Sequence, residues 1–156
     1  MVTLIEYSPL SNPEYIDQVI DALLAESPEL RGVVVEREMV KHMLERSPHL
    51  KCLIHVQDSA LLGVVILQVG PVWYAPRRRC ARDLLVWVAP AWRGSSLGVR
   101  MIRAIEAWAI EHAVDDLYLS QSTGIEVERT AAFYERLGYT LSGFISHKRM
   151  DHVHRI

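Results

Sequence analysis

The 156-residue sequence has only two cysteines, no excess of charge of either sign and no long apolar run. Cys52 and Cys80 do not have the spacing of a zinc site, and no pair of histidines at helical spacing accompanies them, so we expect free thiols and no metal. A disulfide is the alternative, and a reducing compartment disfavours it. The balance of 17 Lys and Arg against 19 Asp and Glu excludes bulk attraction to nucleic acid or to an anionic membrane.

Apolar stretches of the ~20 residues that span a bilayer are also missing from the sequence. The N-terminus lacks the basic start and apolar core of a secretory signal, so we expect a cytoplasmic protein. What the chain does contain is typical of a folded globular protein, since 50% of its residues are hydrophobic and 23% are charged. Its length suits one domain with its own core, so residues 1–156 are predicted to form a single domain.

Hydrophobic periodicity predicts a mixture of helices and strands. Helices are predicted from residue 13 to a break at 27–28, at 36–46, at 97–113, and from 127 to an end at Gly138. Strands are predicted at 2–7, 50–56, 61–70, 80–88 and 115–120, with a turn at 57–59, a connection at 72–79 and a last strand or pair of strands in 139–150. In the second helix, four apolar residues are predicted to share one face: Met39, Val40, Met43 and Leu44. This order of elements indicates an α/β domain.

The segment "RGSSLG", residues 93–98, connects a nearly continuous apolar strand to an amphipathic helix. A helix N-terminus presents backbone N–H groups without intrahelical partners and a partial positive charge, which together favour an anion. Gly94 and Gly98 allow a ligand to approach the backbone, Arg93 can add a charge-assisted hydrogen bond, and Ser95 and Ser96 can donate hydroxyl groups. The pattern therefore favours a phosphate site, and a simple turn is the alternative.

Two stretches in this half of the chain, "VAPAWRGSSLGVRMIRAIEAWA" and "STGIEVERTAAFYERLGYTLSG", carry a resemblance. The first resembles the acetyl-coenzyme A loop of the GCN5-related N-acetyltransferase superfamily, Arg/Gln-x-x-Gly-x-Gly/Ala, with Arg93, Ser96 and Gly98 at its defining positions. The second resembles the A-x-x-x-Tyr-x-x-x-Gly-Phe/Tyr helix of the same superfamily, with Tyr134 and Gly138 in place and Tyr139 at its end. Together they cover roughly residues 83–150. The resemblance implies a mixed central sheet flanked by helices.

The resemblance also implies a binding site for acetyl-coenzyme A. Backbone groups of Val86 and Val88 would bind the pantetheine arm, and Tyr134 would lie near the sulfur and protonate the leaving thiolate. Core packing is the alternative role of Tyr134. The diphosphate would be held by six consecutive residues: Arg93, Gly94, Ser95, Ser96, Leu97 and Gly98.

Two departures from the family pattern bear on coenzyme binding. Ser96 replaces a glycine, so the loop must accept a Cβ there, and Val127 stands where many members have an asparagine. The general base is left open among four residues: Asp83, His55, Glu126 and Glu128. Each of them can instead be a solvated or structurally paired group.

The acceptor is equally open from the sequence. The regions that would border the acceptor cleft in this fold are the connection with Trp73, Tyr74 and Arg77, Arg78 and Arg79, and the segment with Glu29, Arg31 and Glu36. A solvated turn is the plainer role for the three arginines. Contact with an acidic acceptor or with a coenzyme phosphate is the second alternative, and a nucleic-acid surface is the third.

The sequence thus predicts an N-acetyltransferase that transfers acetyl from acetyl-coenzyme A directly to a primary amine of a small molecule or protein. Neither motif contains a cysteine, which disfavours a covalent thiol intermediate. The alternative is a module of the same fold that binds or senses acyl-coenzyme A without turnover. We expect no metal, no nucleic-acid partner and no membrane partner, and a homodimer is plausible by analogy.

Overall fold

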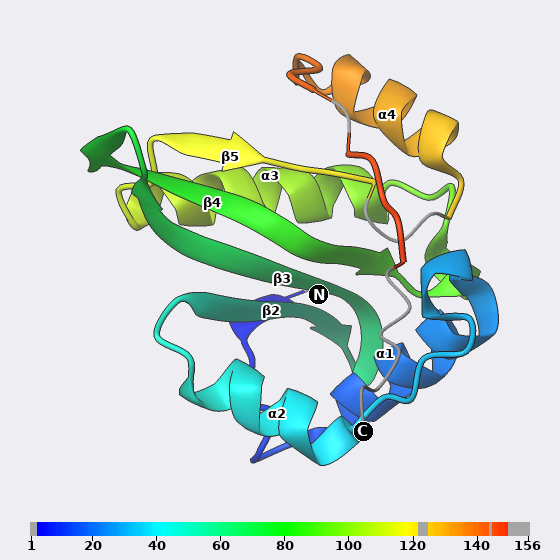
Figure 1. The fold of residues 1–156 in the computed structure, drawn as a ribbon. Coiled ribbons are helices and arrows are strands. Elements are labelled where there is room, and N and C mark those ends of the chain that lie inside the picture. The colour runs from blue at the N-terminus through cyan, green and yellow to red at the C-terminus, as the bar shows by residue number, and fades with distance from the viewer. Residues whose placement is uncertain (1–2, 122–124, 144, 150–156) are drawn as a thin grey trace.

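The computed structural model describes residues 3–121, 125–143 and 145–149, and within them the chain forms one sheet of five strands (Figure 1). The strands follow the order of the chain across the sheet: β1 (Thr3–Glu6), β2 (Leu50–Gln57), β3 (Ala60–Val72), β4 (Ala75–Val88) and β5 (Asp116–Tyr118). β1 to β4 pair antiparallel with their neighbours, whereas β5 pairs parallel with β4. The predicted mixed sheet is confirmed.

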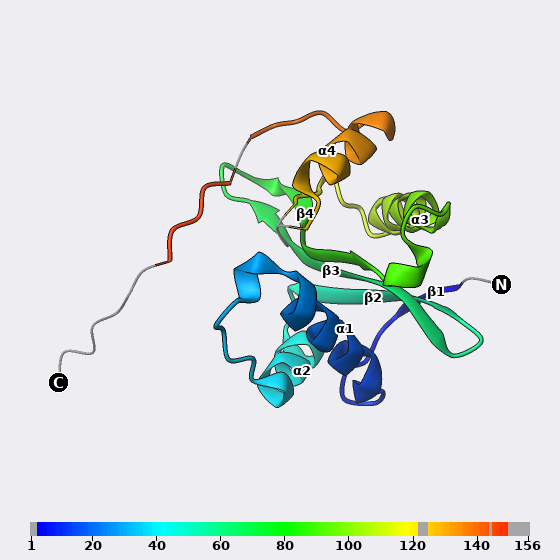
Figure 2. The same cartoon turned by 90° about the vertical axis from the view of Figure 1, so that its right-hand side faces the viewer.

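Helices cover both faces of this sheet (Figure 2). α1 (Pro13–Glu26) and α2 (Arg37–Arg46) lie on one face, and α3 (Leu97–Glu111) and α4 (Val127–Arg136) lie on the other. Two short 3₁₀ helices, η1 (Pro28–Leu30) and η2 (Pro90–Trp92), follow α1 and β4. Alternate residues of the central strands therefore enter two separate apolar cores, because successive side chains of a strand point to opposite faces.

Local sequence signals set several of these boundaries. Pro13 occupies the first turn of α1, where its missing N–H has no intrahelical partner to lose. α4 ends at Arg136, and Gly138 closes its C-terminal turn: the φ of 94° at Gly138 lets its N–H bond to the carbonyl of Glu135 and the N–H of Tyr139 bond to the carbonyl of Tyr134. Asp58 and Ser59 both have positive φ and form the two-residue turn between β2 and β3.

The connection predicted at residues 72–79 is wrong. β3 runs to Val72 and β4 begins at Ala75, so the turn consists of Trp73 and Tyr74 alone. Pro71, which was expected to end the strand, lies inside β3 opposite Arg79 and next to a shift in register. An irregular pairing position tolerates proline because no regular ladder hydrogen bond is required of its nitrogen.

The strand predicted in residues 139–150 is absent from the part of this segment that the structure describes. Leu141 and Ile145 are 52% and 81% exposed, so the apolar residues that suggested a strand have no sheet face to cover. Side-chain contacts hold the segment instead: Arg149 donates to the carbonyl oxygens of Glu29 and Arg31 at 3.2 and 3.0 Å.

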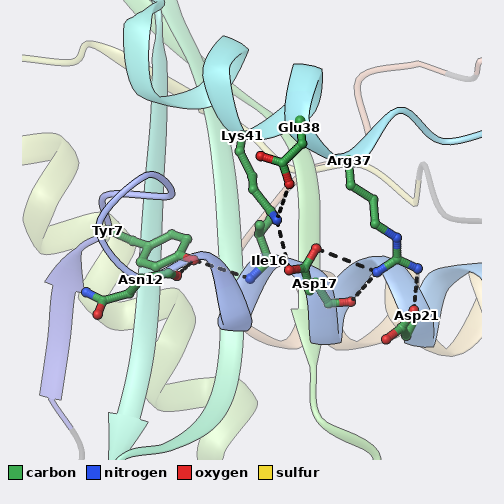
Figure 3. A network of polar contacts seen from close by, with 8 residues as sticks. All are labelled: Tyr7, Asn12, Ile16, Asp17, Asp21, Arg37, Glu38 and Lys41. Atoms are coloured by element: carbon green, nitrogen blue, oxygen red, sulfur yellow. Dashed lines mark hydrogen bonds and ion pairs between the residues drawn. The ribbon is translucent and has the colours of Figure 1, made fainter.

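The apolar face predicted for α2 is also only half right, because Leu44 is buried while Met39 and Met43 are exposed. A polar network occupies the seam between α1 and α2 (Figure 3). The ammonium of Lys41, a residue only 4% exposed, lies 2.8 Å from Asp17 and 2.9 Å from Glu38. Lys41 is buried because these carboxylates compensate its charge, a pairing that hydrophobic periodicity does not register.

Candidate coenzyme and catalytic site

β4 and β5 run side by side for only a short distance in the described chain. Their parallel ladder pairs Cys80, Ala81 and Arg82 with residues 116–118, and β4 then continues alone to Val88. On β3, Ile66 lies opposite Leu85 and Leu67 lies opposite Asp83. Leu84 is therefore an extra residue, a β-bulge that bends β4 at the point where β4 and β5 part. A cleft of about 540 Å³ opens at the carboxyl end of β4.

The backbone of Val86 and Val88 faces this cleft. Ala89 donates its N–H to Leu62 across the β3 ladder at 2.9 Å. Main-chain groups in an antiparallel pair point alternately toward and away from the partner strand, so those of Val86 and Val88 point away from β3 and toward the gap. Val86 and Val88 thus line the cleft, and their predicted binding of the pantetheine arm stays a prediction.

The loop between η2 and α3 forms one wall of the cleft. Gly94 has a φ of 79°, a conformation that a residue with a side chain adopts only at a cost. Ser95 accepts the N–H of Leu97 at 3.1 Å and donates to the carbonyl of Trp92 at 2.6 Å, so its hydroxyl serves the start of α3. Leu97 is fully buried in the core and Ser96 is exposed, and neither is among the described residues that line the cleft.

Arg93 makes contacts that its sequence position did not predict. Its Nε donates to the carbonyl of Val88 at 3.0 Å, and its Nη1 forms an ion pair with Glu26, the last residue of α1. Glu26 lies 67 positions away along the chain, so no local pattern could have indicated this pair. Arg93 therefore connects the end of β4 to α1.

Two side chains of α4 lie close to the loop, those of Phe133 and Arg129. A Cβ added to Gly98 would lie 3.4 Å from Cζ of Phe133, an ordinary van der Waals distance, so the ring of Phe133 lies next to the start of α3. A Cβ added to Gly94 would lie 3.6 Å from Nη2 of Arg129. Arg129 lines the cleft and was missed by the sequence reasoning, although a basic residue five positions before Tyr134 was visible.

Tyr134 of α4 reaches the cleft from the opposite side to β4 and is 5% exposed. Burial raises the pKa of its phenol well above the ordinary value, and the charges of Asp83 and Tyr139 raise it further. Its ring packs beside the rings of Phe133 and Tyr139, with centroids 5.7 and 5.9 Å away. Tyr134 thus contributes to the core and to the cleft at once.

Asp83 lies where β4 leaves β5. Its carboxylate is 8% exposed and accepts the backbone N–H of Ser120 at 2.8 Å. Burial raises the pKa of Asp83 to about 6, and the hydrogen bond from Ser120 opposes that rise. Asp83 is thus the buried carboxyl group whose charge acts on Tyr134.

The other candidate bases lie in different surroundings. His55 is 3% exposed and is not among the described residues that line the cleft. Burial, together with the charge of Arg100, lowers the pKa of His55 to about 4. Glu126 lines the cleft and pairs with Arg129 at 3.2 Å, whereas Glu128 is exposed.

The β3–β4 connection does not border the cleft described above, and its predicted place at the acceptor site stays a prediction. Trp73 and Tyr74 precede β4, whereas the cleft is at its far end. Arg78 pairs with Asp116 at 2.8 Å, and Arg79 donates to the carbonyl of His112 at 2.9 Å, so both arginines support the fold. A role for Glu29, Arg31 and Glu36 at an acceptor site stays a prediction.

The described residues lack both a cluster of metal ligands and a membrane-spanning helix. They contain no group of three or more His, Cys, Asp or Glu side chains that could hold a metal ion. None of the helices in the described ranges has the length and apolar character needed to cross a bilayer. Cys52 and Cys80 are free and buried, which confirms the expected thiols.

The family model of the acetyltransferase (GNAT) family matches residues 16–139. No curated protein matches the sequence significantly. A transcriptional regulator from Bacillus halodurans has a similar structure, with a TM-score of 0.79 at 15% identity, covering 96% of this chain and 100% of that one. A ribosomal-protein-alanine N-acetyltransferase from Brucella melitensis gives 0.72 at 16%, covering 97% and 99%. AAC(6')-Iy in complex with the bisubstrate analogue CoA-S-monomethyl-acetylneamine gives 0.72 at 13%, covering 97% and 99%. At these identities the similarity shows the fold.

Proposed function

The chain belongs to the acetyltransferase (GNAT) family, and from that premise we propose that it transfers an acetyl group from acetyl-coenzyme A to a primary amine of a small molecule or a protein. The observation that carries the proposal is the cleft between the diverging strands. Backbone groups of β4, the glycine-bearing loop before α3 and the phenol of Tyr134 all line it. Acetyl-coenzyme A can use each of these three features: the strand for its pantetheine arm, the loop for its diphosphate and the phenol for its sulfur.

The proposed binding mode assigns a role to each wall. The pantetheine arm lies along Val86 and Val88, and the diphosphate lies on the loop of residues 93–98 at the N-terminus of α3. Backbone N–H groups at a helix start favour a phosphate without any further charge. The N–H of Val88 then polarises the thioester carbonyl, a contribution of about 10²–10³ in rate for one such donor.

In the proposed reaction the neutral amine attacks the thioester carbon, so a C–N bond forms and the C–S bond breaks. The amine nitrogen releases its proton to a base, and Tyr134 donates its phenolic proton to the departing thiolate. A phenol is protonated at neutral pH, and burial raises the pKa of Tyr134 further, so the proton is present when the thiolate leaves. Direct transfer is also supported by Cys52, because burial raises the pKa of its thiol to about 12 and leaves no thiolate to act as a nucleophile.

Both classes of acceptor in this proposal, small molecules and proteins, are represented among the structural neighbours. One neighbour is a ribosomal-protein-alanine N-acetyltransferase, and another was solved with an analogue that joins coenzyme A to acetylneamine. A panel of small amines and N-terminal peptides, assayed for coenzyme A release, tests both classes.

The matched variant for this assay is Tyr134→Phe, which removes the hydroxyl and keeps the ring. An enzyme should lose roughly 10²-fold or more in rate while its coenzyme affinity stays close to that of the wild type. A protein that only binds acyl-coenzyme A releases no coenzyme A with any amine of the panel, and that result would refute the proposed transfer.

A further inference from the structure

Among the described residues, three arginines line the cleft: Arg93, Arg129 and Arg136. Arg93 belongs to the loop of residues 93–98 and Arg129 lies against Gly94 of that loop, and the surroundings of these two differ. Arg93 follows the pattern of the coenzyme loop, and its guanidinium is bound on two sides, by the carbonyl of Val88 and by the carboxylate of Glu26. The side chains of Arg93 and Glu26 are 29% and 25% exposed, so this ion pair is largely withdrawn from water. If Arg93 turned to a phosphate, Glu26 would lose its counter-charge in a half-buried position, which is costly.

Arg129 approaches the same loop from α4. Its Nη2 lies 3.6 Å from the position that a Cβ would occupy on Gly94, so the guanidinium stands directly over the glycine of the loop. Its contacts with Glu126 are both made by Nη1, at 3.2 Å, and the side chains are 60% and 54% exposed. An exposed pair of this kind contributes little to stability and is readily exchanged for another anion.

We propose that these two arginines have separate roles, with Arg129 binding the diphosphate of the coenzyme and Arg93 acting as a positioning residue that fixes the end of β4 to α1. This inference rests on the proposed function, because it names the cation of the same coenzyme site. It reassigns the role that the loop motif suggests for the Arg93 side chain, and it leaves the backbone of the loop as the remainder of the phosphate site.

The chemistry of the two positions supports this division. A planar guanidinium can donate two parallel hydrogen bonds to phosphate oxygens. Arg129 can donate such bonds from α4, while the backbone N–H groups at the start of α3 donate to the same diphosphate from the loop. The Nε of Arg93 donates a hydrogen bond to the carbonyl of Val88, and this bond restrains the end of β4. Since Glu26 ends α1, the same contact fixes α1 relative to the coenzyme strand.

The test compares two ligands on five variants by calorimetry. Coenzyme A carries the diphosphate, and pantetheine has the same thiol arm without any phosphate. Arg129→Ala should weaken coenzyme A binding by about 10- to 100-fold, the usual effect of losing charge-assisted hydrogen bonds, and leave pantetheine binding unchanged. Arg129→Lys should recover part of the loss. Arg77→Ala removes the same charge from an exposed position at the other end of β4 and should bind both ligands as the wild type does.

Arg93→Ala is the fourth variant and has a different expected signature. It should retain the preference for coenzyme A over pantetheine, because the phosphate contact is intact. In steady-state assays it should raise the KM for the amine more than the KM for acetyl-coenzyme A, because α1 leads into the segment of Glu29 and Arg31 that is predicted to border the acceptor site, and α1 is no longer fixed. Glu26→Gln should reproduce that pattern without any change to the arginine itself.

The inference is overturned if Arg129→Ala binds coenzyme A as tightly as the wild type, or if Arg93→Ala loses the preference for coenzyme A over pantetheine. Thermal unfolding without ligand serves as the folding control, and Arg129→Ala should match the wild type because its ion pair is exposed. Failure of the wild type itself to bind coenzyme A would refute the proposed function. Wild-type binding with an unaffected Arg129→Ala would refute this inference alone.

Discussion

The carboxylate of Asp83 accepts the backbone N–H of Ser120 at 2.8 Å, and this bond joins β4 to the segment after β5 just beyond their last paired residues. Beyond the last backbone pair of the two strands, the side chain of Asp83 takes the place of a backbone carbonyl as the acceptor. The N–H of Ser120 therefore keeps a hydrogen-bond partner where the pairing of β4 and β5 ends, and the cleft begins there. The same burial that makes the bond strong also disfavours the charged carboxylate, which gives the site a measurable dependence on pH.

Asp83 should make the protein less stable as pH rises through the weakly acidic range. Its pKa is about 6 in the folded chain against an ordinary 3.8, so between these values the folded state binds more protons than the unfolded state and stability falls with pH. Asp83→Asn keeps an oxygen for Ser120 and removes the charge. We expect Asp83→Asn to be more stable than the wild type above pH 6, by up to about 3 kcal/mol in urea unfolding. If the unfolding free energies of the two proteins changed with pH in the same way from about pH 4 to 7, this prediction would be contradicted.

His55 should have the opposite effect in an overlapping range. Its pKa is about 4 against an ordinary 6.5, so the folded state binds fewer protons there, and the stability it contributes is lost as pH falls from 6.5 to 4. Within the described residues its Nδ1 has no hydrogen-bond partner, which is consistent with a buried neutral ring. His55→Gln should remove this loss.

The two groups therefore offset one another between about pH 4 and 6 in the wild type. Each single variant should expose the slope of the other residue: His55→Gln should lose stability as pH rises, and Asp83→Asn should lose stability as pH falls. Urea unfolding at half-unit steps of pH measures both slopes. Two variants with slopes of the same sign would show that these residues are not the titrating groups.

Gly63 should be intolerant of any side chain. A Cβ at this position of β3 would lie 2.4 Å from Sδ of Met101 and 3.0 Å from the carbonyl oxygen of Trp87. Met101 is fully buried, so it cannot move aside cheaply, and Gly63→Ala should cost about 1–3 kcal/mol. Gly70→Ala is the control on the same strand, because a Cβ there would meet nothing within 4 Å among the described residues. Equal unfolding midpoints for the two variants would rule out this packing.

Lys41 should be important for the seam between α1 and α2. Lys41→Met removes the buried cation and leaves Asp17 without its 2.8 Å partner, which should cost about 1–3 kcal/mol. Adding Asp17→Asn should recover part of the loss. Lys51→Met removes the exposed pair with Glu6 and should change stability by less than about 1 kcal/mol, so similar losses in both lysine variants would contradict the account.

The elements that the sequence predicted correctly have local signals. Pro13 and Gly138 mark helix ends by their own backbone geometry, and the loop at Gly94 needs a residue that accepts positive φ. Two motifs in the correct order were enough to predict the family, which the family model confirms over residues 16–139. These signals depend on residues close together in the chain.

The features that were missed depend on distant residues. Glu26 meets Arg93 across 67 positions, and Lys41 is buried against Asp17 of another helix, so neither contact follows from periodicity. The β3–β4 hairpin was mistaken for a long connection because Pro71 and the arginines after Tyr74 are common in loops, although here the strands continue through them. Arg129 was passed over because its significance comes from Gly94 on a different segment.

The most direct test of the central claim is thermal unfolding of the wild-type protein with and without saturating acetyl-coenzyme A. If the cleft between β4 and β5 binds the coenzyme, the ligand should stabilise the fold by RT ln(1 + [L]/Kd), about 2.7 kcal/mol at a hundredfold excess over Kd, and the unfolding temperature should rise by several degrees. An unfolding temperature that stays the same at every concentration of acetyl-coenzyme A would contradict the account.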